Sequence, residues 1–205
     1  DESTGDSVLG KVYENMTYVG EDTALAVYLN PCCMRGTKEN DYVPIFPFGC
    51  NNSQYKAVKN AMENQISVIE GPPGTGKTQT ILNIIANVLM QGKTVQIVSN
   101  NNSALDNIYD KLSSSKYNLN FIVAKLGNKE NKESFVNAQQ ESYPNFSSWK
   151  IKNNIHTFKN KIKEQSDNLK KFFEKQERLA FLRQELSQMK IEYKHFSECI
   201  KDLDI

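Results

Sequence analysis

The chain has 205 residues, of which 39% are hydrophobic and 24% charged, a composition typical of a folded protein with one or two domains. Its 25 basic and 24 acidic residues give a formal net charge of +1, which argues against a histone-like polycation. No run approaches the roughly 18 apolar residues of a membrane span, and no basic-then-apolar signal segment opens the chain, so we expect neither a membrane protein nor a secreted one.

The cysteines indicate a reducing compartment. They form no C-x-x-C pair, and two of them are adjacent, which suits neither a tetrahedral metal site nor an easy disulfide. We therefore expect reduced thiols in a cytoplasmic protein. The four cysteines are Cys32, Cys33, Cys50 and Cys199.

Residues 1–48 predict a few short β-strands and a linker. Apolar and polar residues alternate loosely, as over residues 24–29, and turn signals follow at Asn30 and Pro31. No residue pattern in this stretch points to a particular chemistry.

Three helices are predicted in the middle of the chain. The first begins near Ser53, and the second has apolar residues at helical spacing over residues 81–89 and ends at Gly92. The third opens with a capping box formed by Ser103 and Asp106.

Short apolar runs between these helices predict buried strands, at residues 66–69, 94–98 and 121–124. Strands that alternate with helices are typical of a parallel sheet with helical crossovers. The predicted fold class of residues 49–144 is therefore α/β.

Residues 145–205 contain neither glycine nor proline and predict a long helical arm. Apolar residues recur at alternating spacings of three and four, with one phase slip near Leu179 and Leu182, which is typical of a coiled-coil seam. A lone helix cannot bury such a stripe. We expect a second helix of the same chain or a second copy to cover it, so a homodimer formed through the arm is possible.

Residues Gly71–Thr78 read G-P-P-G-T-G-K-T and match the Walker A pattern at every fixed position. Gly74 and Gly76 let bare main chain approach phosphate oxygens, and the following helix begins with N–H groups that favour an anion. Lys77 would place a cation against the β- and γ-phosphates, and the Thr78 hydroxyl can bind Mg²⁺. We expect ATP and Mg²⁺ as cofactors, with Lys77 and Thr78 as the candidate catalytic residues.

Residues 51–58 followed by residues 66–78 resemble superfamily 1 DNA/RNA helicases, in the branch that includes the RNA-surveillance helicases. The resemblance covers residues 48–127 and implies an incomplete RecA-like P-loop NTPase domain. In that family the glutamine of the upstream motif holds the adenine edge, a role that falls on Gln54 here. The candidate cofactor-binding residues are Gln54, Gly71, Pro72, Pro73, Gly74, Thr75, Gly76, Lys77, Thr78 and Gln79.

Residues 95–106 resemble the family's motif Ia, which touches the backbone of single-stranded nucleic acid. The family commonly has a proline where Asn100 stands, and a polar loop with a helix cap is the alternative interpretation. The same resemblance implies that residues 145–205 are the helical stalk that some members insert after motif Ia. The candidate nucleic-acid residues are Ser99, Asn100, Asn101 and Asn102.

The Asp-Glu pair that holds Mg²⁺ and activates water in motif II does not follow Lys77; the one Asp-Glu step is Asp1–Glu2. We therefore expect an N-terminal part of a larger ATP-dependent helicase that hydrolyses ATP negligibly by itself. An SMC-like or AAA+ ATPase with a coiled coil, or a non-catalytic nucleotide-binding scaffold that dimerises through its arm, are the alternatives. The sequence does not distinguish DNA from RNA.

Overall fold

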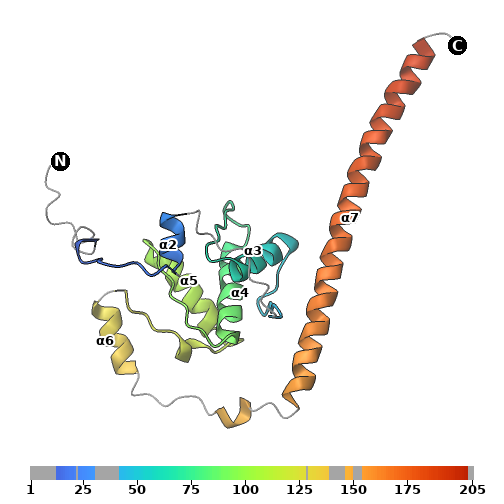
Figure 1. Ribbon diagram of the computed structural model, residues 1–205. Coiled ribbons are helices and arrows are strands. Elements are labelled where there is room, and N and C mark those ends of the chain that lie inside the picture. Colours follow the sequence, from blue (N-terminus) through green and yellow to red (C-terminus); the bar gives the residue numbers. More distant parts are fainter. Residues whose placement is uncertain are drawn as a thin grey trace. The chain divides into compact units, whose positions relative to one another are not determined.

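In the computed structural model (Figure 1) the chain forms two compact units. The first unit comprises residues 1–42 and 46–111, and the second comprises residues 43–45 and 112–205. The structure describes residues 13–21, 23–30, 42–127, 129–138, 146–149 and 154–202.

In the first unit, residues Ala24–Leu29 form helix α2, so the strand predicted over residues 24–29 is wrong. The Thr23 hydroxyl accepts the Ala26 N–H at 3.2 Å and donates to the Gly20 carbonyl at 2.7 Å. This cap gives a partner to an N–H group of the first helical turn that would otherwise have none. The short alternating pattern of the sequence does not reveal such a cap. The other strands predicted before residue 42 fall largely outside the described residues, among them residues 1–12 and 31–41.

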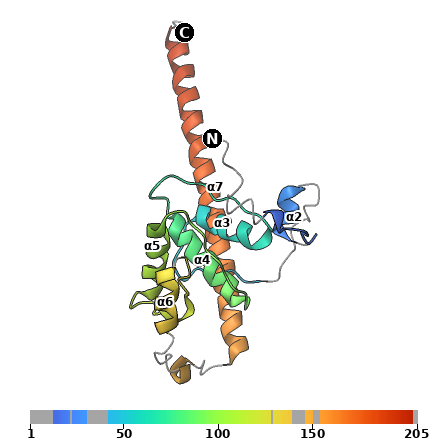
Figure 2. The ribbon, with the colours of Figure 1, turned by 90° about the vertical axis from the view of Figure 1, so that its left-hand side faces the viewer.

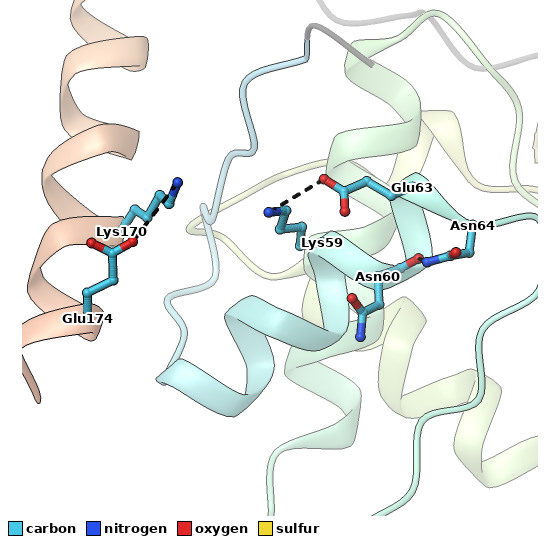
Figure 3. Close-up of polar contacts among 6 residues, drawn as sticks. All are labelled: Lys59, Asn60, Glu63, Asn64, Lys170 and Glu174. Atoms are coloured by element: carbon cyan, nitrogen blue, oxygen red, sulfur yellow. Dashed lines mark hydrogen bonds and ion pairs between the residues drawn. The ribbon is translucent and has the colours of Figure 1, made fainter. Parts of the chain in front are cut away.

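Helix α3 spans Asn52–Glu63 and confirms the helix predicted near Ser53. It begins with a reciprocal capping box, in which Asn51 Oδ1 accepts the Gln54 N–H and Gln54 Oε1 accepts the Asn51 N–H, each at 2.9 Å. Further along α3, Lys59 and Glu63 form an ion pair of 3.8 Å across one turn (Figure 3). These local contacts stabilise both ends of α3.

Helix α4 spans Lys77–Met90 and confirms the second predicted helix. It ends in a Schellman motif, as its glycine predicts: Gly92 has a φ of +70° and donates to Leu89, while the Lys93 N–H donates to Val88 at 3.2 Å. Helix α3 packs against α4, and both views show the two helices side by side (Figures 1 and 2).

The apolar core of the first unit gathers side chains from these helices and from α5, which spans Asn102–Ser113. Val58 of α3 is completely buried, and Leu82 of α4 is 1% exposed. Among the described residues of this unit, Val27, Ile85 and Ile108 are the other buried apolar residues. The α3–α4 pair thus provides a rigid support for the turn that joins the two helices.

The described residues contain no β-strand, so the predicted parallel sheet is not confirmed. Residues 66–69 and 94–98 have irregular backbone, and residues 120–122 form a 3₁₀-helix (η3, Asn120–Ile122) where the third strand was expected. A strand needs a neighbour for its N–H and C=O groups, and sequence periodicity cannot supply one. Val68 and Val98, which a sheet would bury, are 79% and 81% exposed.

The second unit contains α6 (Lys129–Ala138), a 3₁₀-turn η4 (Phe146–Trp149) and the long helix α7 (Ile155–Asp202). Helix α7 confirms a long helix over most of the predicted arm, residues 145–205, whereas residues 146–149 form the 3₁₀-turn in place of the first part of that helix. Lys170 and Glu174 form an ion pair of 4.0 Å on the surface of α7 (Figure 3). Apolar residues of its stripe are exposed, so the coiled coil stays a prediction. Over the described residues, no helix combines the length and apolar character needed to cross a membrane.

Tyr42 contributes a buried hydroxyl that has no hydrogen-bond partner among the described residues. Burial and the neighbouring Glu63 carboxylate raise the pKa of Tyr42 to about 12. Because a buried O–H without a partner costs about 1 kcal/mol or more, we expect Tyr42→Phe to stabilise the fold by about 1 kcal/mol. Urea unfolding measures this change, and Tyr28→Phe, at a 72% exposed ring, is the neutral control. A loss of stability in Tyr42→Phe would contradict the assignment.

Candidate nucleotide-binding site

The turn before α4 has left-handed backbone at two glycines. Gly74 and Gly76 have φ angles of +86° and +81°, which residues with a side chain rarely adopt. A Cβ at Gly76 would lie 2.2 Å from Gln54 Nε2, so the Gln54 amide would have to move away from the turn. Thr75 closes the turn: its hydroxyl donates to the Pro72 carbonyl at 2.8 Å.

Gly76 is also the N-cap residue of α4, and no side chain caps the helix there. The N–H groups of the first helical turn have no partner within the helix, and they lie at the positive end of the helix dipole. An uncapped helix start that follows a glycine turn is the arrangement that binds phosphate in many nucleotide sites.

The ammonium of Lys77 lies at the beginning of the glycine turn, beside Gly71 and Pro72. Its Nζ donates to the carbonyls of Gly71 and Pro72, the latter at 3.0 Å, and the side chain is exposed. A phosphate group that approached the turn would compete with these neutral carbonyls for the ammonium, and an anionic acceptor makes the stronger bond. Lys77 is therefore positioned to exchange a structural role for a ligand contact.

Gln54 reaches the turn from α3 and is only 7% exposed. Its Nε2 lies 3.2 Å from the Thr75 carbonyl, 3.3 Å from the Gly76 carbonyl and 3.3 Å from Gln79 Oε1. The side chain predicted to hold adenine is thus in contact with the backbone of the glycine turn, residues 71–78. Its adenine contact stays a prediction, and an adenine acceptor would have to replace one of these three.

Thr78 is the second residue of α4 and is partly buried. Its hydroxyl has the oxygen chemistry that Mg²⁺ prefers. No cluster of three or more His, Cys, Asp or Glu side chains that could hold a metal ion occurs in the described part of the chain. Mg²⁺ commonly takes most of its ligands from phosphate oxygens and water, so a Mg²⁺ ion beside Thr78 would not need such a cluster.

The candidate nucleic-acid residues form a capped loop at the start of α5. Asn101 Oδ1 accepts the Ser103 N–H at 3.0 Å and the Ser103 hydroxyl at 2.8 Å, and Ser99 Oγ accepts the Asn101 N–H at 3.1 Å. The helix thus begins at Asn102, one residue before the predicted cap Ser103, because the Asn101 carboxamide accepts the Ser103 N–H and so caps the helix from an earlier position. Asn100, Asn101 and Asn102 are exposed.

Sequence reasoning missed Asn83. Within the apolar pattern of α4 an asparagine looks like an interruption, yet Asn83 is completely buried. Its Nδ2 donates to the Gly49 carbonyl at 2.8 Å, and its Oδ1 accepts the Phe48 N–H at 3.2 Å. The available signal was the polar residue on the buried face of a helix, because buried polar groups are retained where they have partners.

Several named proteins align with part of this chain. DNA polymerase alpha-associated DNA helicase A of Schizosaccharomyces pombe is 47% identical over 66 residues, which are 32% of this chain and 10% of that protein. An uncharacterized ATP-dependent helicase of Mycoplasma pneumoniae is 40% identical over 84 residues, 41% of this chain and 7% of that protein. A Drosophila melanogaster homolog of regulator of nonsense transcripts 1 is 41% identical over 63 residues, 30% of this chain and 5% of that protein.

The matched segment thus spans a tenth or less of each of these relatives. No solved structure matches the chain significantly. Among protein families, the one described as AAA domain (AAA_11) matches residues 49–204, which include the glycine turn, α3, α4 and α7. Because this match covers well over half of the sequence, the chain belongs to that AAA domain family.

Proposed function

We propose that this chain is the nucleotide-binding part of an ATP-dependent nucleic-acid helicase or translocase. The observation that carries the proposal is the uncapped start of α4 behind two left-handed glycines, with the Lys77 ammonium beside it. Relatives whose names include "helicase" support it. The helicase names of the aligned relatives favour this proposal over the SMC-like, AAA+ and scaffold alternatives.

In this proposal the residues of the glycine turn, Gly71 to Thr78, hold the triphosphate of ATP. Lys77 binds the β- and γ-phosphates, Thr78 binds Mg²⁺, and Gln54 and Gln79 lie on the adenine side. Bound Mg²⁺ would neutralise charge on the phosphate oxygens. The first turn of α4 orients the phosphates through its N–H groups, which need no rearrangement to do so.

We also propose that residues 66–69, 94–98 and 121–124 pair as strands of a RecA-like sheet in the complete protein. Their exposed apolar side chains support this, because a sheet covered by helices would bury them. The proposed domains are residues 1–48, 49–144 and 145–205, with the last as a helical stalk. A second helix or a second copy would cover its apolar stripe, as in a coiled coil.

We further propose that exposed amides of Asn100, Asn101 and Asn102, together with Ser99, bind the backbone of single-stranded DNA or RNA. Amide groups can hydrogen-bond phosphate and sugar without reading sequence. A cytoplasmic location is the last part of the proposal and agrees with the free thiols of Cys50 and Cys199.

Two measurements test the proposal on the 205-residue chain. Titration calorimetry is expected to show heat on addition of Mg-ATP, whereas a phosphate-release assay is expected to show negligible turnover, because no Asp-Glu pair follows Lys77. A longer form that includes such a pair is the positive control for hydrolysis. The absence of any nucleotide binding, or turnover by this chain at the rate of the longer form, would refute the proposal.

A further inference from the structure

Residues 46–50, called the linker below, precede the N-cap residue of α3 in the sequence. They contact both α3 and α4. On the α3 side, the Phe46 ring packs on the Tyr55 ring, with centroids 5.2 Å apart. On the α4 side, Asn83 bonds both the Phe48 N–H and the Gly49 carbonyl. A buried carboxamide thus binds the linker at two points, much as a neighbouring strand would bind it.

Gln79 connects this linker to the glycine turn. Its Nε2 donates to the Phe48 carbonyl, and its Oε1 lies 3.3 Å from Gln54 Nε2. Gly49 also approaches Gln79 closely, since a Cβ there would lie 3.3 Å from Gln79 Nε2. Gln79, predicted as a cofactor-binding residue, therefore directs its carboxamide toward the linker and Gln54.

The Gln54 carboxamide is fully used on its donor side. Its two hydrogens face three acceptors, the carbonyls of Thr75 and Gly76 and the side-chain oxygen of Gln79. Its oxygen accepts the Asn51 N–H and keeps a second lone pair. Of the three acceptors only Gln79 is a side chain that can turn away, so Gln79 controls whether Gln54 can serve another acceptor.

We propose that Asn83 and Gln79 are positioning residues that hold the linker and the Gln54 amide as the base-binding side of the nucleotide site. This inference rests on the proposed function and adds residues and a segment that the Walker A motif does not contain. Asn83 fixes the linker, Gln79 joins the linker to Gln54, and neither needs to touch phosphate through its side chain. The side chains of Asn83 and Gln79 thus affect the adenine side of the site, whereas the bonds of Gln54 to the Thr75 and Gly76 carbonyls are the ones that reach the phosphate turn.

The test compares ATP with inorganic tripolyphosphate, which has no base. In Asn83→Leu, which keeps the number and branching of the side-chain heavy atoms but removes both bonds to the linker, we expect ATP affinity to fall roughly 5- to 10-fold, as the loss of one or two hydrogen bonds implies. Tripolyphosphate affinity is expected to stay within twofold. Gln79→Met, at a partly buried position, is the second variant, and its ratio of ATP to tripolyphosphate affinity should fall likewise.

Asn87→Leu is the matched control, because Asn87 is a buried asparagine of α4 whose Nδ2 donates to the Asn83 carbonyl at 2.7 Å. Circular dichroism and urea midpoints establish that each variant folds. A parallel fall in ATP and tripolyphosphate affinity, or no change in either, would overturn the inference. Wild-type chain that bound neither ligand would instead remove the proposed function.

Cys50 gives a readout that needs no variant. It lies between Gly49, which Asn83 binds, and Asn51, whose N–H donates to Gln54. We expect ATP to slow alkylation of Cys50 by iodoacetamide, while tripolyphosphate at equal occupancy leaves the rate unchanged. The exposed Cys199 is the internal reference. Because burial raises the pKa of the Cys50 thiol, the assay is run near pH 9. An unchanged Cys50 rate with ATP bound would count against the inference.

Discussion

Lys77→Ala is expected to weaken binding of Mg-ATP to this chain by about 100-fold, because the ammonium is the one cation of the Walker A turn and a charge-assisted hydrogen bond contributes about 1.5–3 kcal/mol. The structure adds a second reason. Lys77 Nζ also bonds the carbonyls of Gly71 and Pro72, so its removal loosens the turn itself. Titration calorimetry of wild type and variant measures the difference.

Two further variants separate charge from geometry. Lys77→Arg keeps the charge but replaces a compact ammonium with a planar group, and should retain part of the affinity. Lys93→Ala removes an exposed lysine just after the far end of α4 and should change affinity less than twofold. If Lys77→Ala bound Mg-ATP within twofold of wild type, the glycine turn would not be the phosphate site.

Sequence predicted the helices of this chain well because their signals are local. Helical spacing placed α3, α4 and α7, and Gly92 marked the end of α4 by a motif that needs only neighbouring residues. The described residues contain no strand. A strand forms only when a neighbouring strand bonds its backbone N–H and C=O groups, and periodicity along the chain cannot identify that neighbour. Residues 24–29 were mispredicted as a strand: they form a helix that Thr23 caps and whose Val27 is buried, and the alternating pattern reveals neither feature.

The candidate site likewise has one part that a local sequence pattern predicts and another part that depends on residues far apart in the sequence. The glycine turn could be predicted because its glycines and lysine are contiguous, and the structure has left-handed backbone at Gly74 and Gly76. That this turn binds phosphate stays a prediction. The contacts of Gln54 and Asn83 join residues 21 to 35 positions apart, and no local pattern encodes them. Asn83 looked like a defect in an apolar helix, although its complete burial is what allows it to bind the linker.

Gly76→Ala is expected to destabilise the fold more than Gly74→Ala, although both glycines have nearly the same φ. Left-handed backbone costs a residue with a side chain about 1–2 kcal/mol, and this cost applies to both variants. A Cβ at Gly74 would meet no atom within 4 Å, whereas a Cβ at Gly76 would lie 2.2 Å from Gln54 Nε2. The displaced amide would lose its bonds while buried, which adds about 1–3 kcal/mol.

A double-mutant cycle isolates that second cost. In Gly76→Ala combined with Gln54→Ala the clashing amide is absent, so the two losses in the free energy of unfolding should add to clearly more than the loss of the double variant. Gly74→Ala combined with Gln54→Ala should be nearly additive, because a Cβ at Gly74 meets nothing. Urea unfolding of the six chains measures both coupling energies. Equal coupling energies at the two glycines would show that the Gln54 amide does not contact Gly76 closely in solution. The contacts of Gln54 with Thr75 and Gly76 could then not fix the shape of the phosphate site.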